Sequence, residues 1–142
     1  MVLSKRAKYM FDACQNILYR HKLLYPRLKD YKLTVTHRNK YLGLTKFLSK
    51  CILLNYNLLD LGSEKQIIST IFHEMAHALD LTQYNYNKKR GGYHGNTWKT
   101  WMKLFNFPCD HGGDFYNYNS LQIKDYGIKT KYKLRYLNAC LK

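Results

Sequence analysis

The chain has 142 residues, which is enough for one domain over residues 1–142 and too short for two independent cores. Its hydrophobic fraction of 46% is that of a globular protein and argues against disorder. The 24 Lys and Arg residues outnumber the 9 Asp and Glu residues, and the resulting net charge of +15 favours a polyanionic partner such as nucleic acid. A merely soluble, lysine-rich surface is the alternative explanation of that charge.

The cysteines and the N-terminal residues restrict the location of the protein. Cys14, Cys51, Cys109 and Cys140 are widely spaced, so no CxxC pair can form a local zinc ribbon or redox motif. The first residues lack the apolar run of a signal peptide, and no stretch approaches the ~18 uninterrupted apolar residues of a membrane span. We therefore expect a soluble, intracellular protein without a membrane partner, nuclear in a eukaryote and cytoplasmic otherwise.

A helix and three strands are predicted in the first part of the chain. From about Lys5 to Leu24 apolar residues recur at three- and four-residue steps, which is typical of an amphipathic helix, and Pro26 lies just beyond its end. Segments 31–37, 41–47 and 51–56 read as short strands with tight connections between them. We expect a small antiparallel meander of three to four strands packed on helices.

A second, buried helix follows these strands. Ser63 and Gln66 form a capping box, in which each side chain satisfies a backbone N–H of the other residue. The helix that they open, roughly residues 64–81, is apolar over much of its circumference and should be the central helix of the domain. Together with the strands it predicts an α+β fold, which is zincin-like because this central helix carries an HExxH motif at residues 73–77.

The remainder of the chain has weaker signals. Residues 84–92 form a polar, basic loop, and a short helix is expected over 96–105, before Pro108. The extension over about 106–142 is basic and rich in Tyr and Lys, with a strand expected at 131–136. The catalytic part of the domain is therefore expected to span about residues 5–105.

An HExxH motif lies on the predicted central helix, at His73, Glu74 and His77. Histidines four residues apart differ by about 40° around a helix and ~6 Å along it, so both can reach one metal ion. Glu74 projects about 100° away from His73, where it can act as a general base toward a water at the metal. Chance produces such a motif in roughly one shuffled chain in 300. Because burying these side chains without a partner is costly, we favour a catalytic zinc site over a satisfied core histidine pair.

A catalytic zinc ion needs a third protein ligand and one open position. Glu74 is the last glutamate of the chain, which excludes a downstream glutamate, and Gln83 stands where the metzincin pattern requires a histidine. We favour His94, because it follows a glycine-containing loop at the start of the next helix and can fold back over the motif. The remaining candidates are His111, Asp110 and Asp114.

Several other residues are candidates for supporting roles. Asp80, one turn after His77, can orient a ligand histidine or can be an ordinary surface carboxylate. Tyr93 is a candidate for stabilising the oxyanion of the transition state. Trp98 and Trp101 can stack on unpaired bases or can pack in the core. The basic residues that can contact a phosphate backbone, or that merely form solvated faces, include Lys88, Lys89, Arg90, Lys131, Lys133 and Arg135, together with the cluster Lys5, Arg6 and Lys8.

Several segments carry a family resemblance. Residues 41–44 and 51–55 are similar to a strand pair that precedes a catalytic helix, and residues 71–78 are similar to that helix. Residues 93–102 are similar to a segment in which a histidine followed by glycine supplies the third metal ligand. Through these segments, roughly over residues 5–105, the chain resembles the SprT-like family, the metallopeptidase domain of Spartan-type proteins.

The resemblance implies one zinc ion held by His73, His77 and His94, with Glu74 as the general base. It also implies DNA-dependent cleavage of proteins bound or crosslinked to DNA, hence a role in DNA repair and a single-stranded or junction-containing DNA partner. Many relatives carry a four-cysteine zinc ribbon that helps to bind DNA, and this chain lacks it. The alternatives are a general zinc peptidase that is not coupled to DNA and a DNA-binding module with a vestigial zinc site.

Overall fold

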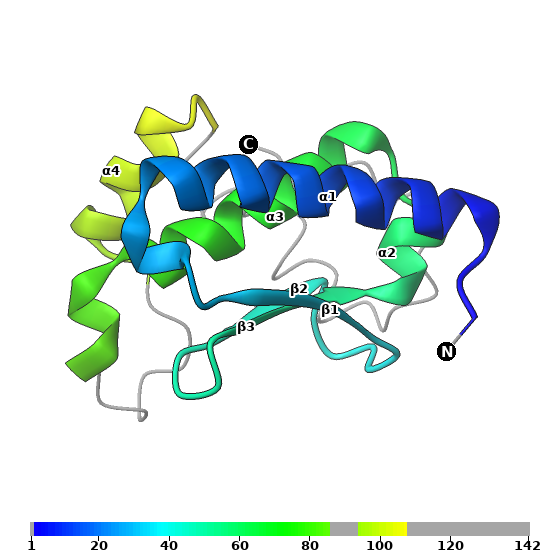
Figure 1. Cartoon of the computed structure of the whole chain (residues 1–142), viewed down its shortest axis with the longest axis horizontal. Helices are drawn as coiled ribbons and strands as arrows, with labels where there is room; N and C mark the ends of the chain where they lie inside the picture. The colour runs from blue at the N-terminus through cyan, green and yellow to red at the C-terminus, as the bar shows by residue number, and fades with distance from the viewer. Residues whose placement is uncertain (1, 86–93, 108–142) are drawn as a thin grey trace, which may run out of the picture.

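A computed structural model of the chain describes residues 2–85 and 94–107. Helices α1 and α3 lie on the same side of a small sheet, and α4 lies at the C-terminal end of α3 (Figure 1). The predicted α+β class is confirmed. The elements are α1 (Lys5–Leu24), η1 (Pro26–Leu28), β1 (Lys32–Thr36), β2 (Gly43–Lys46), β3 (Cys51–Asn55), α2 (Tyr56–Leu61), α3 (Glu64–Leu79), η2 (Leu81–Asn85) and α4 (Asn96–Leu104).

The first helix has the bounds that the sequence predicts. The Ser4 side chain caps it by accepting a hydrogen bond from the backbone N–H of Ala7. Pro26 follows the helix end and cannot donate the backbone hydrogen bond that another turn would need. One side of the helix is buried at three- and four-residue steps, through Ala7, Met10, Cys14 and Leu18.

The three predicted strands are present, but the predicted antiparallel meander is wrong. The strand order is β1-β3-β2, with β3 parallel to β1 and antiparallel to β2. A turn that includes Lys50, at a positive φ of 54°, leads from β2 into β3. β3 therefore returns between the two earlier strands instead of adding outside them. Alternation of apolar residues identifies a strand and its faces, but it carries no information about the order of the strands.

Asn55, fully buried at the end of β3, bonds to the connection between β1 and β2 and also caps α2. Its side-chain Nδ2 donates to the carbonyl of Arg38 and to Oδ1 of Asn39, at 2.8 and 3.1 Å, which holds the connection from β1 to β2 across the end of β3. Its Oδ1 accepts from the backbone N–H of Leu58 and so caps α2, a helix that the sequence analysis did not predict.

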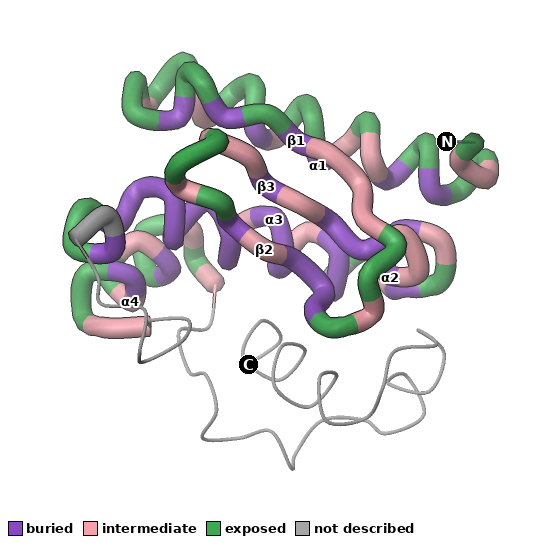
Figure 2. Tube along the Cα trace, turned by 90° about the horizontal axis from the view of Figure 1, so that it is seen from below, coloured by how far each residue is buried: buried purple, intermediate pink, exposed green. Residues whose placement is uncertain are grey.

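Helix α3 is the buried central helix. The predicted capping box is confirmed, with hydrogen bonds of 3.0 and 3.2 Å between Ser63 and Gln66. Figure 2 shows that α3 is buried along most of its length behind the sheet. The main core joins apolar residues of α1, α2, α3 and the sheet, among them Met10, Leu54, Leu58, Ile67 and Ile71. None of the helices within residues 2–85 and 94–107 is long and apolar enough to cross a membrane.

A smaller core docks α4 onto the C-terminal half of α3. It consists of Ala76 from α3 and of Trp98 and Met102 from α4. Because only Gly95 separates His94 from α4, this packing brings His94 back to the face of α3 that carries the HExxH histidines.

Candidate metal centre

Three histidine side chains converge on one point. The Nε2 atoms of His73, His77 and His94 lie 3.0 to 3.2 Å from one another. Two imidazole nitrogens bound to a tetrahedral zinc ion at ~2.0–2.1 Å would lie about 3.3 Å apart, so this spacing fits such an ion closely. The three histidines can therefore hold a metal ion. His94 is the residue that sequence analysis favoured among several alternatives, and the structure places it with the other two.

The orientation of His77 is set by a buried chain of hydrogen bonds. Its Nδ1 lies 2.9 Å from the side-chain oxygen of Gln83, and because that oxygen can only accept, Nδ1 carries the proton and Nε2 keeps its lone pair for a metal. The amide of Gln83 donates to Asp80 Oδ2 at 2.8 Å, and Thr82 donates to Asp80 Oδ1 through both its backbone and its hydroxyl.

This arrangement modifies the expectation for Asp80. The carboxylate is 0% exposed, so the alternative of a surface carboxylate is wrong. It acts on His77 through Gln83 and not by direct contact. Sequence analysis treated Gln83 only as the residue that excludes a metzincin ligand. Gln83 lies three residues after Asp80, and side chains at this spacing meet within a helical turn. This spacing is the feature of the sequence that could have predicted the hydrogen bond between Gln83 and Asp80.

Glu74 lies beside the three histidines and is almost fully buried, with 3% of its surface exposed. Its Oε2 is 3.9 Å from Nε2 of His73, and its Oε1 accepts a 2.8 Å hydrogen bond from the hydroxyl of Thr45. Burial raises the pKa of Glu74 to about 8, and the Thr45 hydrogen bond opposes part of that rise. A raised pKa makes the ionised carboxylate a stronger proton acceptor.

The residues of this site lie in a part of the chain that is similar to a known protein family. The model of the SprT-like family matches residues 8–124. The chain belongs to the SprT-like family. The matched segment of this SprT-like chain includes His73, Glu74, His77 and His94. Comparison with curated proteins and with solved structures gave no match.

Trp98 lies against the three histidines of this SprT-like protein. Its ring centroid lies 4.6 to 5.7 Å from those of the three histidines, and its indole N–H donates to the carbonyl of His73 at 3.3 Å. The side chain is 0% exposed. The core-packing alternative is therefore correct for Trp98, because a fully buried indole has no free face on which a nucleic-acid base could stack.

Other sequence-predicted residues are placed elsewhere or not described. Trp101 is half-buried and packs edge-on against Tyr25, at a centroid distance of 5.1 Å. In the basic cluster near the N-terminus, Arg6 donates to backbone carbonyls at the end of α2 and Lys8 pairs with Asp12. Outside the described residues lie Tyr93, Lys88, Lys89, Arg90, Lys131, Lys133 and Arg135, and the alternative ligands His111, Asp110 and Asp114.

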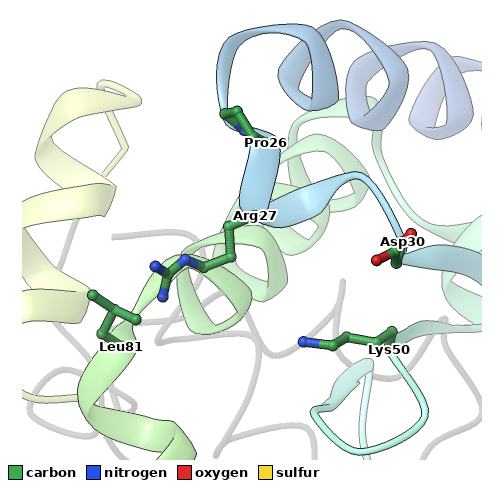
Figure 3. Close-up of a pocket in the computed structure, with 5 residues that line it drawn as sticks. All are labelled: Pro26, Arg27, Asp30, Lys50 and Leu81. Atoms are coloured by element: carbon green, nitrogen blue, oxygen red, sulfur yellow. The ribbon is translucent and has the colours of Figure 1, made fainter.

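Two adjoining pockets lie around η1 and the segment that follows α3. The first, of about 430 Å³, is lined by Arg27, Lys50 and Asp30 together with Pro26 and Leu81, and Figure 3 shows the Arg27 and Lys50 side chains extending along it. The second, of about 500 Å³, shares Pro26, Arg27 and Leu81 and continues to Tyr25, Leu79, Thr97 and Trp101. Neither is lined by a residue of the metal centre.

Proposed function

We propose that this SprT-like protein is a zinc metalloendopeptidase, in which His73, His77 and His94 hold one zinc ion and Glu74 is the general base. The observation that carries the proposal is the convergence of three imidazole nitrogens beside a buried carboxylate. Within the described part of the chain the cluster contains three metal-ligating side chains. Structural zinc sites use four protein ligands, whereas catalytic sites use three and keep one position open.

The side chains divide the work of peptide hydrolysis between them. A bound zinc ion supplies a Lewis acid that lowers the pKa of water and polarises the scissile carbonyl. Glu74 accepts a proton at Oε2, the oxygen that faces the histidines, from the water that attacks the scissile carbonyl. It then delivers this proton to the amine that leaves when the peptide C–N bond breaks. Gln83 keeps His77 in the tautomer whose Nε2 faces the metal position, and Trp98 excludes water from one side of the histidines.

The hydrogen-bond chain behind His77 gives the first prediction. Replacing Gln83 with leucine should weaken zinc affinity by roughly 10- to 100-fold, because His77 would lose the acceptor that fixes its tautomer and orientation. Competition against a chelator measures this affinity. Gln83→Glu combined with Asp80→Asn, which keeps an acceptor next to Nδ1 and reverses the hydrogen bond between residues 80 and 83, is the matched control and should retain tight binding. Equal affinities for Gln83→Leu and the wild type would contradict the prediction.

We propose further that cleavage depends on DNA and acts on proteins bound or crosslinked to DNA. The net charge of +15 supports a polyanionic partner. Among the described residues, the two pockets around Arg27 support a contact with single-stranded DNA. They combine the cationic side chains of Arg27 and Lys50 with the half-buried rings of Tyr25 and Trp101. Cations that bind phosphates beside aromatic rings that stack on bases are typical of single-strand binding sites.

Proteolysis of a DNA-binding protein, measured with and without single-stranded DNA, tests this proposal. We expect cleavage to require DNA and to be absent in Glu74→Gln. Arg27→Glu combined with Lys50→Glu should raise the DNA concentration for half-maximal cleavage by about tenfold or more. Lys40→Glu combined with Lys46→Glu makes the same charge change at exposed positions outside the pockets and should have a smaller effect.

The alternatives give different results in the same experiment. A general zinc peptidase would cleave with or without DNA, and cleavage would still require Glu74. A DNA-binding module with a vestigial zinc site would bind DNA and zinc but would cleave nothing. Equal effects of the two double variants would contradict the assignment of the DNA contact to the pockets around Arg27, while leaving DNA dependence itself intact.

A further inference from the structure

The two carboxylate oxygens of Glu74 have different surroundings. Oε2 is on the side of the histidines, 3.9 Å from Nε2 of His73. Oε1 is on the side of β2, where the Thr45 hydroxyl lies 2.8 Å away. Thr45 is itself buried, with 9% of its surface exposed. One oxygen is therefore directed toward the metal centre while the other is held by the sheet.

Strand β2 approaches Glu74 closely at a second position, Gly43. A Cβ atom at Gly43 would lie 3.0 Å from Cγ and 3.1 Å from Oε2 of Glu74, and 2.9 Å from Cγ2 of Thr70. Gly43 and Thr45 are two residues apart and so belong to the same face of the strand. The glycine leaves room for the glutamate between β2 and α3, and the threonine supplies the hydrogen bond.

The Thr45 hydroxyl has two acceptors within reach, both on the same residue. It lies 2.8 Å from Oε1 and 2.9 Å from the backbone carbonyl oxygen of Glu74. When the carboxylate is ionised, the hydroxyl can donate to Oε1. When Oε2 carries the proton, Oε1 becomes the carbonyl oxygen of the carboxyl group and can still accept from the same hydroxyl. The contact between Thr45 and Glu74 can thus persist before and after proton transfer.

We propose that Thr45 is a positioning residue, which holds Oε1 of Glu74 so that Oε2 stays directed at the metal centre through both stages of the reaction. This inference rests on the proposed function, in which Glu74 is the general base. A glutamate side chain has several rotatable bonds, and a rate depends steeply on the placement of its reacting oxygen. The β-branched Thr45 is well suited to this role, because its own χ1 is restricted.

Two matched pairs of variants isolate the hydroxyl from the shape of the side chain. In the first pair, Thr45→Val replaces the hydroxyl of the wild-type threonine with a methyl group. In the second pair, Thr45→Ser keeps the hydroxyl and Thr45→Ala lacks it. In each pair we expect the form without the hydroxyl to have a kcat lower by about tenfold or more, with KM and zinc affinity unchanged. The second pair tests the inference even if the valine variant fails to fold.

A spectroscopic measurement on the metal-free protein provides a readout that does not depend on activity. The chain contains two glutamates, Glu74 and the exposed Glu64, so selective ¹³C labelling of glutamate gives two carboxyl resonances. We expect Thr45→Val to shift the Glu74 resonance, Thr45→Ser to restore it, and Glu64 to stay unchanged in both.

The two readouts separate failure of this inference from failure of the proposed function. Hydroxyl-free variants with wild-type kcat and an unshifted Glu74 resonance would overturn the inference. So would a loss of kcat that is the same in Thr45→Ser as in Thr45→Ala, because the hydroxyl would then be irrelevant. If Glu74→Gln itself left hydrolysis unchanged, the proposed function would fail, whatever the resonance shows.

Discussion

Replacing Glu74 with glutamine is expected to lower kcat for peptide hydrolysis by about 10²- to 10⁴-fold, the usual contribution of a general base. Glutamine has nearly the same shape, and its amide oxygen can still accept the hydrogen bond from Thr45. It cannot take up a proton. Because burial disfavours the charged carboxylate, we expect the neutral amide to leave the fold and its stability intact.

The matched control is Glu64→Gln, the same chemical change at an exposed position in the first turn of the same helix. It should retain wild-type hydrolysis. Zinc content, measured by elemental analysis, should be one ion per chain in both variants, since the three histidines are unchanged. A Glu74→Gln protein that binds zinc and cleaves at the wild-type rate would exclude Glu74 as the base.

Replacing His94 with alanine is expected to weaken zinc binding by about 100-fold or more. Losing a residue that only orients a ligand costs roughly 10- to 100-fold, and losing the ligand itself should cost at least as much. His73 and His77 would remain as two ligands on one helix, and the opposite side of the metal position would be open. His94→Ala should lose both the zinc ion and the activity. Glu74→Gln, in contrast, should lose the activity and keep the zinc ion.

Thermal unfolding with and without added zinc measures this effect. Zinc that binds the native state raises the Tm of the wild type, and the rise should largely disappear in His94→Ala. His37→Ala removes an exposed histidine away from the site and should keep the full rise. His111→Ala tests an alternative ligand from the sequence analysis. If zinc still stabilised His94→Ala but no longer stabilised His111→Ala, the assignment of the third ligand would be wrong.

The features of this protein that depend on local spacing can be predicted from its sequence. Apolar periodicity and caps such as Ser63 determine where α1, α3 and α4 lie, because both act within a few residues along the chain. Helical geometry places His73 and His77 on one face. The position of His94 after a glycine-containing loop favours it over the other candidates, but this is a weaker signal.

The features that depend on contacts between distant segments become visible in the folded chain alone. The order β1-β3-β2 depends on pairing between strands that are distant in sequence, which no alternation of apolar residues encodes, and contacts of Asn55 hold the β1–β2 connection across the end of β3. Thr45 and Gly43 meet Glu74 across about 30 positions of sequence, and nothing near them in the chain indicates that contact. Burial decided the roles of Asp80 and Trp98, because a carboxylate or an indole has the same local signature on a surface as in a core.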